Sequence, residues 1–289
     1  VRLDDYAIDD VHHNYIRTNP GFGRMMDWAG LIDGARLFLV VFARVVALLR
    51  TAPLTSSSAI PPIARGSLSF FTAVIFTSFV GDSYGVLPEA GLGYAMVVIA
   101  EILLGIIMGL FLQLVFGIFQ TAGQLFSFQM GFGASQVFDP LAQVEMPLIG
   151  QFLNLIGLAV FLSVTGMQRL FLLGLAGSFR VMKGTDFLAA GPFLQETFIK
   201  AIGGLFEQSL VLASPILGTL LLISVTMGLL AKAAPQMNLL MVGFPIQIAV
   251  GFIIMLVATP FLAEKMSQLV DMGFGLIESY LLATQGALP

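Results

Sequence analysis

Residues 100–109 read A-E-I-L-L-G-I-I-M-G, and this stretch decides the fold class because it places a single carboxylate within a long apolar run. The run spans about 91–119, and Glu101 is its only charged residue. Its length and composition predict a helix that can cross a bilayer. Glu101 and Gly105 share one face of this helix, and Gly105 with Gly109 forms a small-residue pair that permits close helix packing. We therefore expect the carboxylate to face another helix rather than lipid.

Two roles for Glu101 stay open at this point. A carboxylate inside a membrane segment can belong to an ion pathway or couple transport, as in a transporter. It can also be structural, paired with another group or placed at the level of the lipid headgroups.

The composition of the whole chain agrees with a membrane protein. Of 289 residues, 57% are hydrophobic and only 10% are charged, whereas a typical soluble domain is about 25% charged. Such a chain cannot cover its core with polar surface, so its natural surroundings are lipid or other apolar protein. The net charge is −4 and the basic residues are scattered, which argues against nucleic-acid binding.

Outward from this segment the sequence predicts further helices, separated by polar turns and by a charged stretch at 176–204. The apolar segments lie at about 31–49, 62–80, 91–119, 147–175, 205–231 and 237–263, and an amphipathic helix follows at about 264–282. Pro215 lies inside the fifth segment, and Pro245 and Pro260 are expected to break the sixth. The predicted fold is therefore an all-α membrane protein.

The basic residues do not follow the distribution that is typical of independent membrane spans. No lysine or arginine occurs between Arg65 and Arg169. Alternating crossings would place Arg169 and Lys232 on opposite sides, against the positive-inside rule. We therefore expect that the helices are not placed in the bilayer as independent spans.

The sequence gives no sign of catalysis. It has no cysteine, and both histidines, His12 and His13, lie in a polar N-terminal extension (1–24) that does not resemble a signal peptide. It also lacks a G-x-x-x-x-G-K-[ST] motif and any histidine partner for a serine. We expect no enzyme activity, no cofactor and no metal site.

The stretch 129–140 reads Q-M-G-F-G-A-S-Q-V-F-D-P and suits neither lipid nor water. Irregular backbone at membrane depth is tolerated only where protein buries it or where it lines a water-filled cavity. Phenylalanine and methionine can fill such a cavity, and glycine permits rearrangement. A hydrophobic constriction of this kind can gate by dewetting. The residues alone therefore leave two readings, a pore plug and a packed interhelical loop.

Lys232 lies in A-K-A-A-P-Q, where Pro235 is expected to end the helix. Its ammonium group can complement the negative end of that helix. Alternatively, it can pair with a carboxylate on a neighbouring chain.

Several short motifs resemble those of the FliR family of flagellar export-apparatus proteins, whose virulence-secretion counterpart is the SctT family. The matching pieces run in the same order from about residue 26 to 263. They are F-A-R-V-V-A-L-L-R-T-A-P (42–53), A-I-P-P-I-A-R-G (59–66), A-E-I-L-L-G (100–105), A-G-Q-L-F-S-F-Q-M-G (122–131), D-P (139–140), Q-F-L-N-L (151–155), F-L-S-V-T-G (161–166), S-F-R (178–180), A-S-P (213–215), K-A-A-P-Q-M-N (232–238) and V-G-F-P (242–245).

The resemblance implies a subunit of the type III export gate in the bacterial inner membrane, within the flagellar basal body. Its partners would be FliP-like and FliQ-like subunits, an FlhB-like protein, and the unfolded flagellar proteins that are exported. The resemblance implies kinked helical hairpins, with a FliP-like N-terminal part and a FliQ-like C-terminal part. The division would fall in the charged stretch, which gives a FliP-like part at 25–190 and a FliQ-like part at 191–289. No cofactor is implied.

The resemblance also assigns site residues. The loop 128–140 would plug the lumen, and the basic-x-x-Pro-Gln turn would lie between the last two hairpin helices. The helix-contact residues are expected from their spacing, and not from the resemblance, to pack or pair subunits. The plug residues are Phe128, Gln129, Met130, Gly131, Phe132, Gly133 and Phe138; the packing or pairing residues are Glu101, Gly105, Gly109, Lys232, Pro235 and Gln236. Lysine at 232, where arginine is common in the family, keeps the charge but loses bidentate pairing.

Two other classes of protein remain as alternatives. One is a secondary transporter with broken helices, in which Glu101 is the coupling carboxylate; it should show an internal repeat, and none is visible between 31–175 and 205–282. The other is a membrane scaffold without a pore, which would need only packing from the 129–140 loop.

Overall fold

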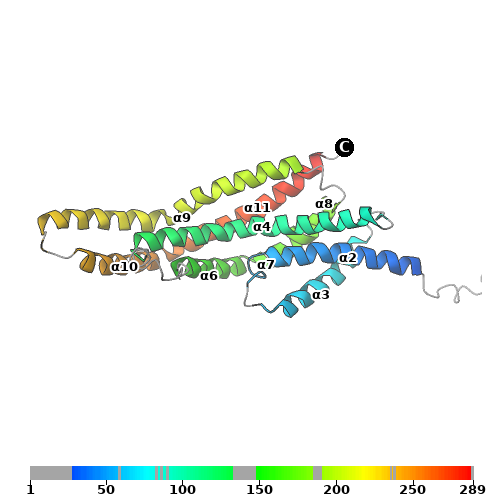
Figure 1. Cartoon of the computed structure of the whole chain (residues 1–289), viewed down its shortest axis with the longest axis horizontal. Coiled ribbons are helices and arrows are strands. Elements are labelled where there is room, and N and C mark those ends of the chain that lie inside the picture. Colours follow the sequence, from blue (N-terminus) through cyan, green and yellow to red (C-terminus); the bar gives the residue numbers. More distant parts are fainter. Residues whose placement is uncertain are drawn as a thin grey trace, which may run out of the picture.

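The computed structural model describes residues 28–57, 60–81, 84, 87–88, 91–132, 148–184, 191–234, 236 and 239–287. Every regular element in these ranges is helical, which confirms the predicted all-α fold (Figure 1). The helices are α2 (Trp28–Thr51), α3 (Pro62–Val80), α4 (Leu92–Gln129), α6 (Leu148–Ser163), α7 (Gly166–Arg169), the π-helix η1 (Leu170–Gly177), α8 (Ser178–Val181), α9 (Gly191–Ala233), α10 (Leu239–Val257) and α11 (Thr259–Ala287).

Helix α4 is the central element of an elongated molecule (Figure 1). Helix α2 packs along one part of it, α6 along another, and α9 runs beside it on the opposite side. The α2–α4 contact is close because α4 presents glycines there. A Cβ placed on Gly105 would lie 2.8 Å from Ala47 Cβ, and one on Gly109 would lie 2.6 Å from Thr51 Cβ. The predicted small-residue pair therefore packs against α2 within the same chain.

Two helices are longer than the apolar segments predict. The expected end of the third segment near residue 119 is wrong, because α4 continues to Gln129. Gly123 lies inside this helix and abuts the backbone of Gly150 in α6. Similarly, α9 begins at Gly191 rather than near 205. Phe198 in the early turns of α9 packs against the core. This packing holds the start of the helix in place although charged residues lie nearby.

The chain bends sharply at two places, and neither is the predicted break at Pro245. Helix α10 runs through Pro245 without interruption, as neighbouring helices allow in membrane proteins. The α6 axis turns by 70° into α7–α8, and the α10 axis turns by 63° into α11. The first bend lies at Thr165, which has φ 57° and ψ 29°. The second lies just before Pro260, which is accepted in the first turn of α11.

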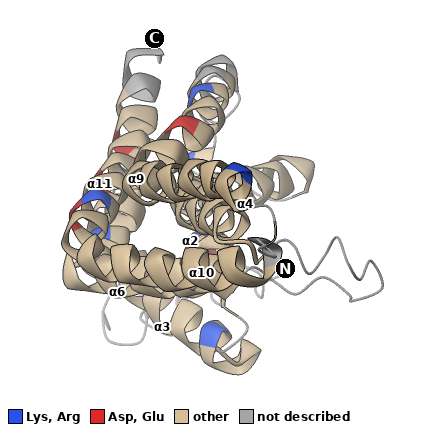
Figure 2. Cartoon of the chain, turned by 90° about the vertical axis from the view of Figure 1, so that its left-hand side faces the viewer, with Lys and Arg blue, Asp and Glu red and all other residues tan. Residues whose placement is uncertain are grey.

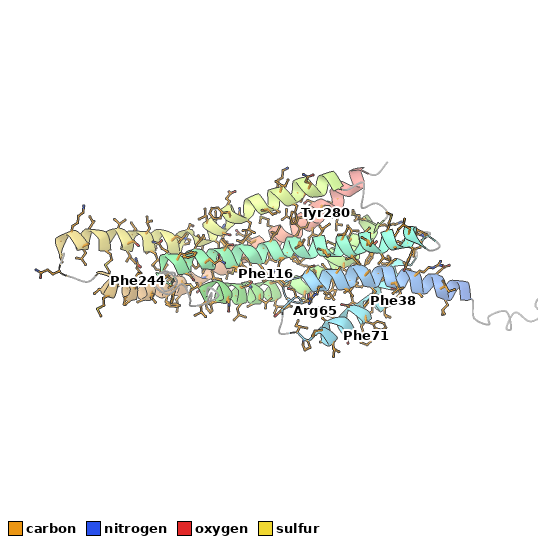
Figure 3. All side chains as sticks on the ribbon, viewed as in Figure 1. Phe38, Arg65, Phe71, Phe116, Phe244 and Tyr280 are labelled. Atoms are coloured by element: carbon orange, nitrogen blue, oxygen red, sulfur yellow. The ribbon has the colours of Figure 1, made fainter. Side chains whose placement is uncertain are left out.

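The helices have the length and composition of membrane-crossing segments. Within the described residues, three qualify by themselves: Pro62–Val80, Leu92–Gln129 and Thr197–Ala233; up to five do so if each bent pair counts as one span. Charged residues are sparse along the ribbon (Figure 2). Many apolar side chains face outward, including Phe71 on α3, which is 65% exposed (Figure 3). The chain is therefore an all-α membrane protein.

Candidate functional site

The end of α4, where the glycine- and phenylalanine-rich stretch begins, is held by a Schellman motif. Gly131 adopts φ 89°, a backbone conformation that favours glycine. Its N–H donates to the carbonyl of Phe128 at 3.1 Å, and the Phe132 N–H donates to the carbonyl of Ser127 at 3.0 Å. These two bonds satisfy carbonyls that the helix end would otherwise leave free. The turn after α4 is thus fixed by local hydrogen bonds.

Three consecutive residues after this helix end pack against α10. Met130 is 1% exposed, and a Cβ placed on Gly251 would lie 2.7 Å from its Cε. A Cβ placed on Gly131 would meet the ring of Phe244, with Cε1 at 2.8 Å (Figure 3 labels Phe244). The rings of Phe132 and Phe252 meet edge to face, with centroids 6.5 Å apart.

A polar triad joins the same helix end to both α9 and α10. Gln129 Nε2 donates to Ser224 Oγ at 3.3 Å, and Gln247 Nε2 donates to the same oxygen at 3.0 Å. The Ser224 hydroxyl donates to the Leu220 carbonyl at 3.0 Å. Since a hydroxyl has one donor and two acceptor lone pairs, these three bonds use its full capacity. We call residues 128–132 the plug base, and Gln129, Ser224 and Gln247 the polar triad.

The predicted plug residues thus divide into three groups. Gln129, Met130, Gly131 and Phe132 contact the α9–α10 hairpin, as described above. Phe128 belongs to the last turn of α4 and is 64% exposed. Gly133 and Phe138 lie outside the described residues.

An apolar groove lies beside the plug base. It has a volume of about 800 Å³ and runs between α6 and the α10–α11 bend. Its walls include Phe152 and Leu155 on one side, and Phe252 and Leu256 on the other. Phe252 therefore contributes both to the groove and to the contact with Phe132.

The second group of predicted residues centres on Glu101, which is fully buried. Its Oε2 forms an ion pair with Nε of Arg44 in α2. Its Oε1 accepts hydrogen bonds from the Tyr84 hydroxyl and, at 2.7 Å, from the Gly184 N–H. Both carboxylate oxygens therefore have partners within the chain.

Arg44 is as deeply buried as Glu101 and uses its remaining donors nearby. Nη1 donates to Ser178 Oγ and Nη2 to the Met182 carbonyl, each at 2.9 Å. The guanidinium also lies 4.1 Å from the centroid of the Phe179 ring. The ion pair therefore ties α2 and α4 to the segment around α8.

Tyr84 lies between α3 and α4 and completes this cluster. Burial raises the pKa of its hydroxyl well above the ordinary value, and the negative charge of Glu101 raises it further. The hydroxyl therefore stays protonated at neutral pH and keeps its hydrogen bond to Glu101.

The third predicted feature is the basic-x-x-Pro-Gln turn at the tip of the α9–α10 hairpin. Lys232 lies in the last turn of α9 and is exposed, as is Gln236. Lys232 has no hydrogen bond or ion pair with any residue that the structure describes. Pro235 lies outside the described residues.

Sequence reasoning did not find the residues that receive the plug base. They are Ser224, Phe244, Gln247, Gly251 and Phe252. Gln247 carried a usable signal, because an amide inside an otherwise apolar segment needs a hydrogen-bond partner. The two phenylalanines carried none, since they resemble any other apolar residue of a membrane helix.

Comparison with known proteins identifies the family. The family described as bacterial export proteins, family 1, matches residues 35–273. The flagellar biosynthetic protein FliR of Bacillus subtilis is 32% identical over 231 residues, which cover 78% of this chain and 87% of that protein. FliR of Escherichia coli K12 is 30% identical over 243 residues, 83% of this chain and 91% of that protein. The chain belongs to the FliR family of bacterial export proteins.

Proposed function

We propose that this chain is a subunit of the flagellar type III export gate in the bacterial inner membrane. Together with FliP-like and FliQ-like subunits, and with an FlhB-like protein alongside, it forms a channel for unfolded flagellar proteins. Family membership supports this role. The apolar helices agree with a place in or at the membrane. The single observation that carries a gating role is the fixed position of the plug base against the α9–α10 hairpin.

The plug of this proposal runs from Phe128 to Phe138 and blocks the lumen with aromatic side chains. A blocking loop needs a fixed attachment, because a freely moving loop would not close a pore. The Schellman motif and the packing of Met130 on Gly251 supply such an attachment. Phe128, whose ring is 64% exposed, is free to face the lumen.

The outer faces of the chain suit contacts with other subunits. Exposed apolar side chains cover α3 and the α9–α10 hairpin, for example Phe79 at 76% and Leu256 at 75%. The ammonium of Lys232 at the hairpin tip, which has no ion pair among the described residues, can meet a carboxylate of a neighbouring subunit. In this proposal residues 25–190 form the FliP-like part and 191–289 the FliQ-like part, and the undivided helix from Gly191 supports that boundary.

The secondary-transporter alternative is less compatible with the geometry. A coupling carboxylate must exchange a proton or an ion during the transport cycle. Glu101 is fully buried, and its oxygens already accept bonds from Arg44, Tyr84 and Gly184. That arrangement is typical of a structural ion pair.

The experiment that tests the plug compares two exposed phenylalanines. Phe128→Ala removes a ring that is 64% exposed, and Phe71→Ala on α3 removes one that is 65% exposed, so neither change should disturb folding by more than about 0.5 kcal/mol. We expect ion leak through assembled gates, or altered export of flagellar subunits, for Phe128→Ala and not for Phe71→Ala. Unchanged leak and export in both Phe128→Ala and Phe132→Ala would contradict the plug.

A further inference from the structure

We infer that Ser224 and Gln247 are positioning residues that hold the plug base on the α9–α10 hairpin, so that the position of the hairpin sets the position of residues 128–132. This inference rests on the proposed gating function. It adds residues of the C-terminal hairpin to a gate that sequence reasoning confined to residues 128–140.

The hydrogen-bond pattern of Ser224 is the first argument. A serine inside a helix commonly satisfies its hydroxyl by donating to its own i−4 carbonyl, as Ser224 does with Leu220. Its two lone pairs then remain free for acceptance in an apolar region. Here they are filled by Gln129 of α4 and Gln247 of α10. One side chain thus connects three helices.

The packing of α10 is the second argument. Phe244, Gln247 and Gly251 are separated by three and four residues, so they lie on one face of the helix. On that face Phe244 contacts Gly131, Gln247 bonds to Ser224, and Gly251 contacts Met130. The absence of a side chain at Gly251 makes room for Met130, which is 1% exposed.

The opposite side of the hairpin is the third argument. Ile253 is 62% exposed and Leu256 75%. The hairpin therefore presents an apolar outer surface while its inner face holds the plug base. A movement of α10 that is imposed from outside would move Phe244 and Gly251, and with them the residues they contact.

The test uses paired substitutions on the same helices. Ser224→Ala removes the shared hydroxyl, and Ser224→Thr keeps it. Thr226→Ala is the matched control, because Thr226 is exposed on α9 and its hydroxyl, among the described residues, bonds to its own helix alone, at the Leu222 carbonyl. On α10, Gly251→Ala displaces Met130, whereas a Cβ on Gly243 meets nothing within 4 Å.

The measurement is amide hydrogen exchange of residues 126–132 in the full chain within its complex, recorded beside ion leak. For Ser224→Ala and Gly251→Ala we expect exchange to accelerate by about tenfold, since local opening becomes easier when hydrogen bonds and packing are lost. Leak should increase in the same variants. Thr226→Ala, Ser224→Thr and Gly243→Ala should behave as the parent protein.

The outcomes separate this inference from the gating proposal. Unchanged exchange in both Ser224→Ala and Gly251→Ala would overturn the positioning role, whatever the leak. Accelerated exchange without leak or altered export would support the positioning role and contradict the plug. Equal acceleration in the control variants would also overturn the inference, because the effect would then not depend on these contacts.

Discussion

Removal of the Glu101 carboxylate should be among the most damaging single changes to this protein. Glu101→Ala leaves the guanidinium of Arg44 fully buried without a counter-charge. Ser178 Oγ and the Met182 carbonyl remain as acceptors, but neither carries a charge. Loss of one partner of a buried ion pair typically costs about 3–5 kcal/mol. That is a large part of a total stability of about 5–15 kcal/mol.

The same reasoning predicts that removing both charges is tolerated better than removing one. Replacement of a buried ion pair by apolar side chains of similar volume is often neutral or stabilising. The double variant Arg44→Met with Glu101→Leu should therefore recover most of the stability that Glu101→Ala loses. Glu207→Ala, which removes an exposed carboxylate on α9, should change stability by less than about 0.5 kcal/mol.

The assay is reversible unfolding of the purified chain in mixed micelles, followed by circular dichroism as the denaturing detergent increases. Thermal melting monitored by size-exclusion chromatography gives a second measurement. A loss below about 1 kcal/mol for Glu101→Ala would refute the reasoning, because it would mean that Arg44 finds compensation elsewhere. So would a double variant that is as unstable as the single one.

Three further predictions concern other contacts. Gly109→Ala forces a Cβ against Thr51 and should lower stability by more than about 2 kcal/mol in the same assay, whereas Gly34→Ala, with open space around it, should not. Thr165→Gly should raise the stability of the chain or leave it unchanged. Thr165 at φ 57° carries backbone strain of about 1–3 kcal/mol, and relief of that strain should offset the greater flexibility of glycine. A clear loss of stability would contradict this strain. Lys232→Ala should weaken copurification with FliP-like and FliQ-like subunits without changing the stability of the isolated chain; intact copurification would remove the pairing role.

The sequence predicted the elements of this fold better than their ends. The apolar run around Glu101 identified α4, but its end was placed about ten residues too early. The glycine and glutamines after residue 119 were expected to lie beyond the helix, although in the structure Gly123 lies inside it and makes room for Gly150 of α6. Glycine permits both a turn and a close helix contact, so composition alone does not distinguish them.

Glu101 shows most clearly what the sequence determined and what it did not. A lone carboxylate in an apolar helix beside Gly105 was enough to predict that it faces protein. Its partner, Arg44, lies 57 residues away, and the Gln129–Ser224 bond spans 95 residues. Composition and periodicity fix which segments become membrane helices, because burial of apolar surface depends on local residue types. Pairs of polar groups depend on which helices pack together and in what register, and only the tertiary structure decides that.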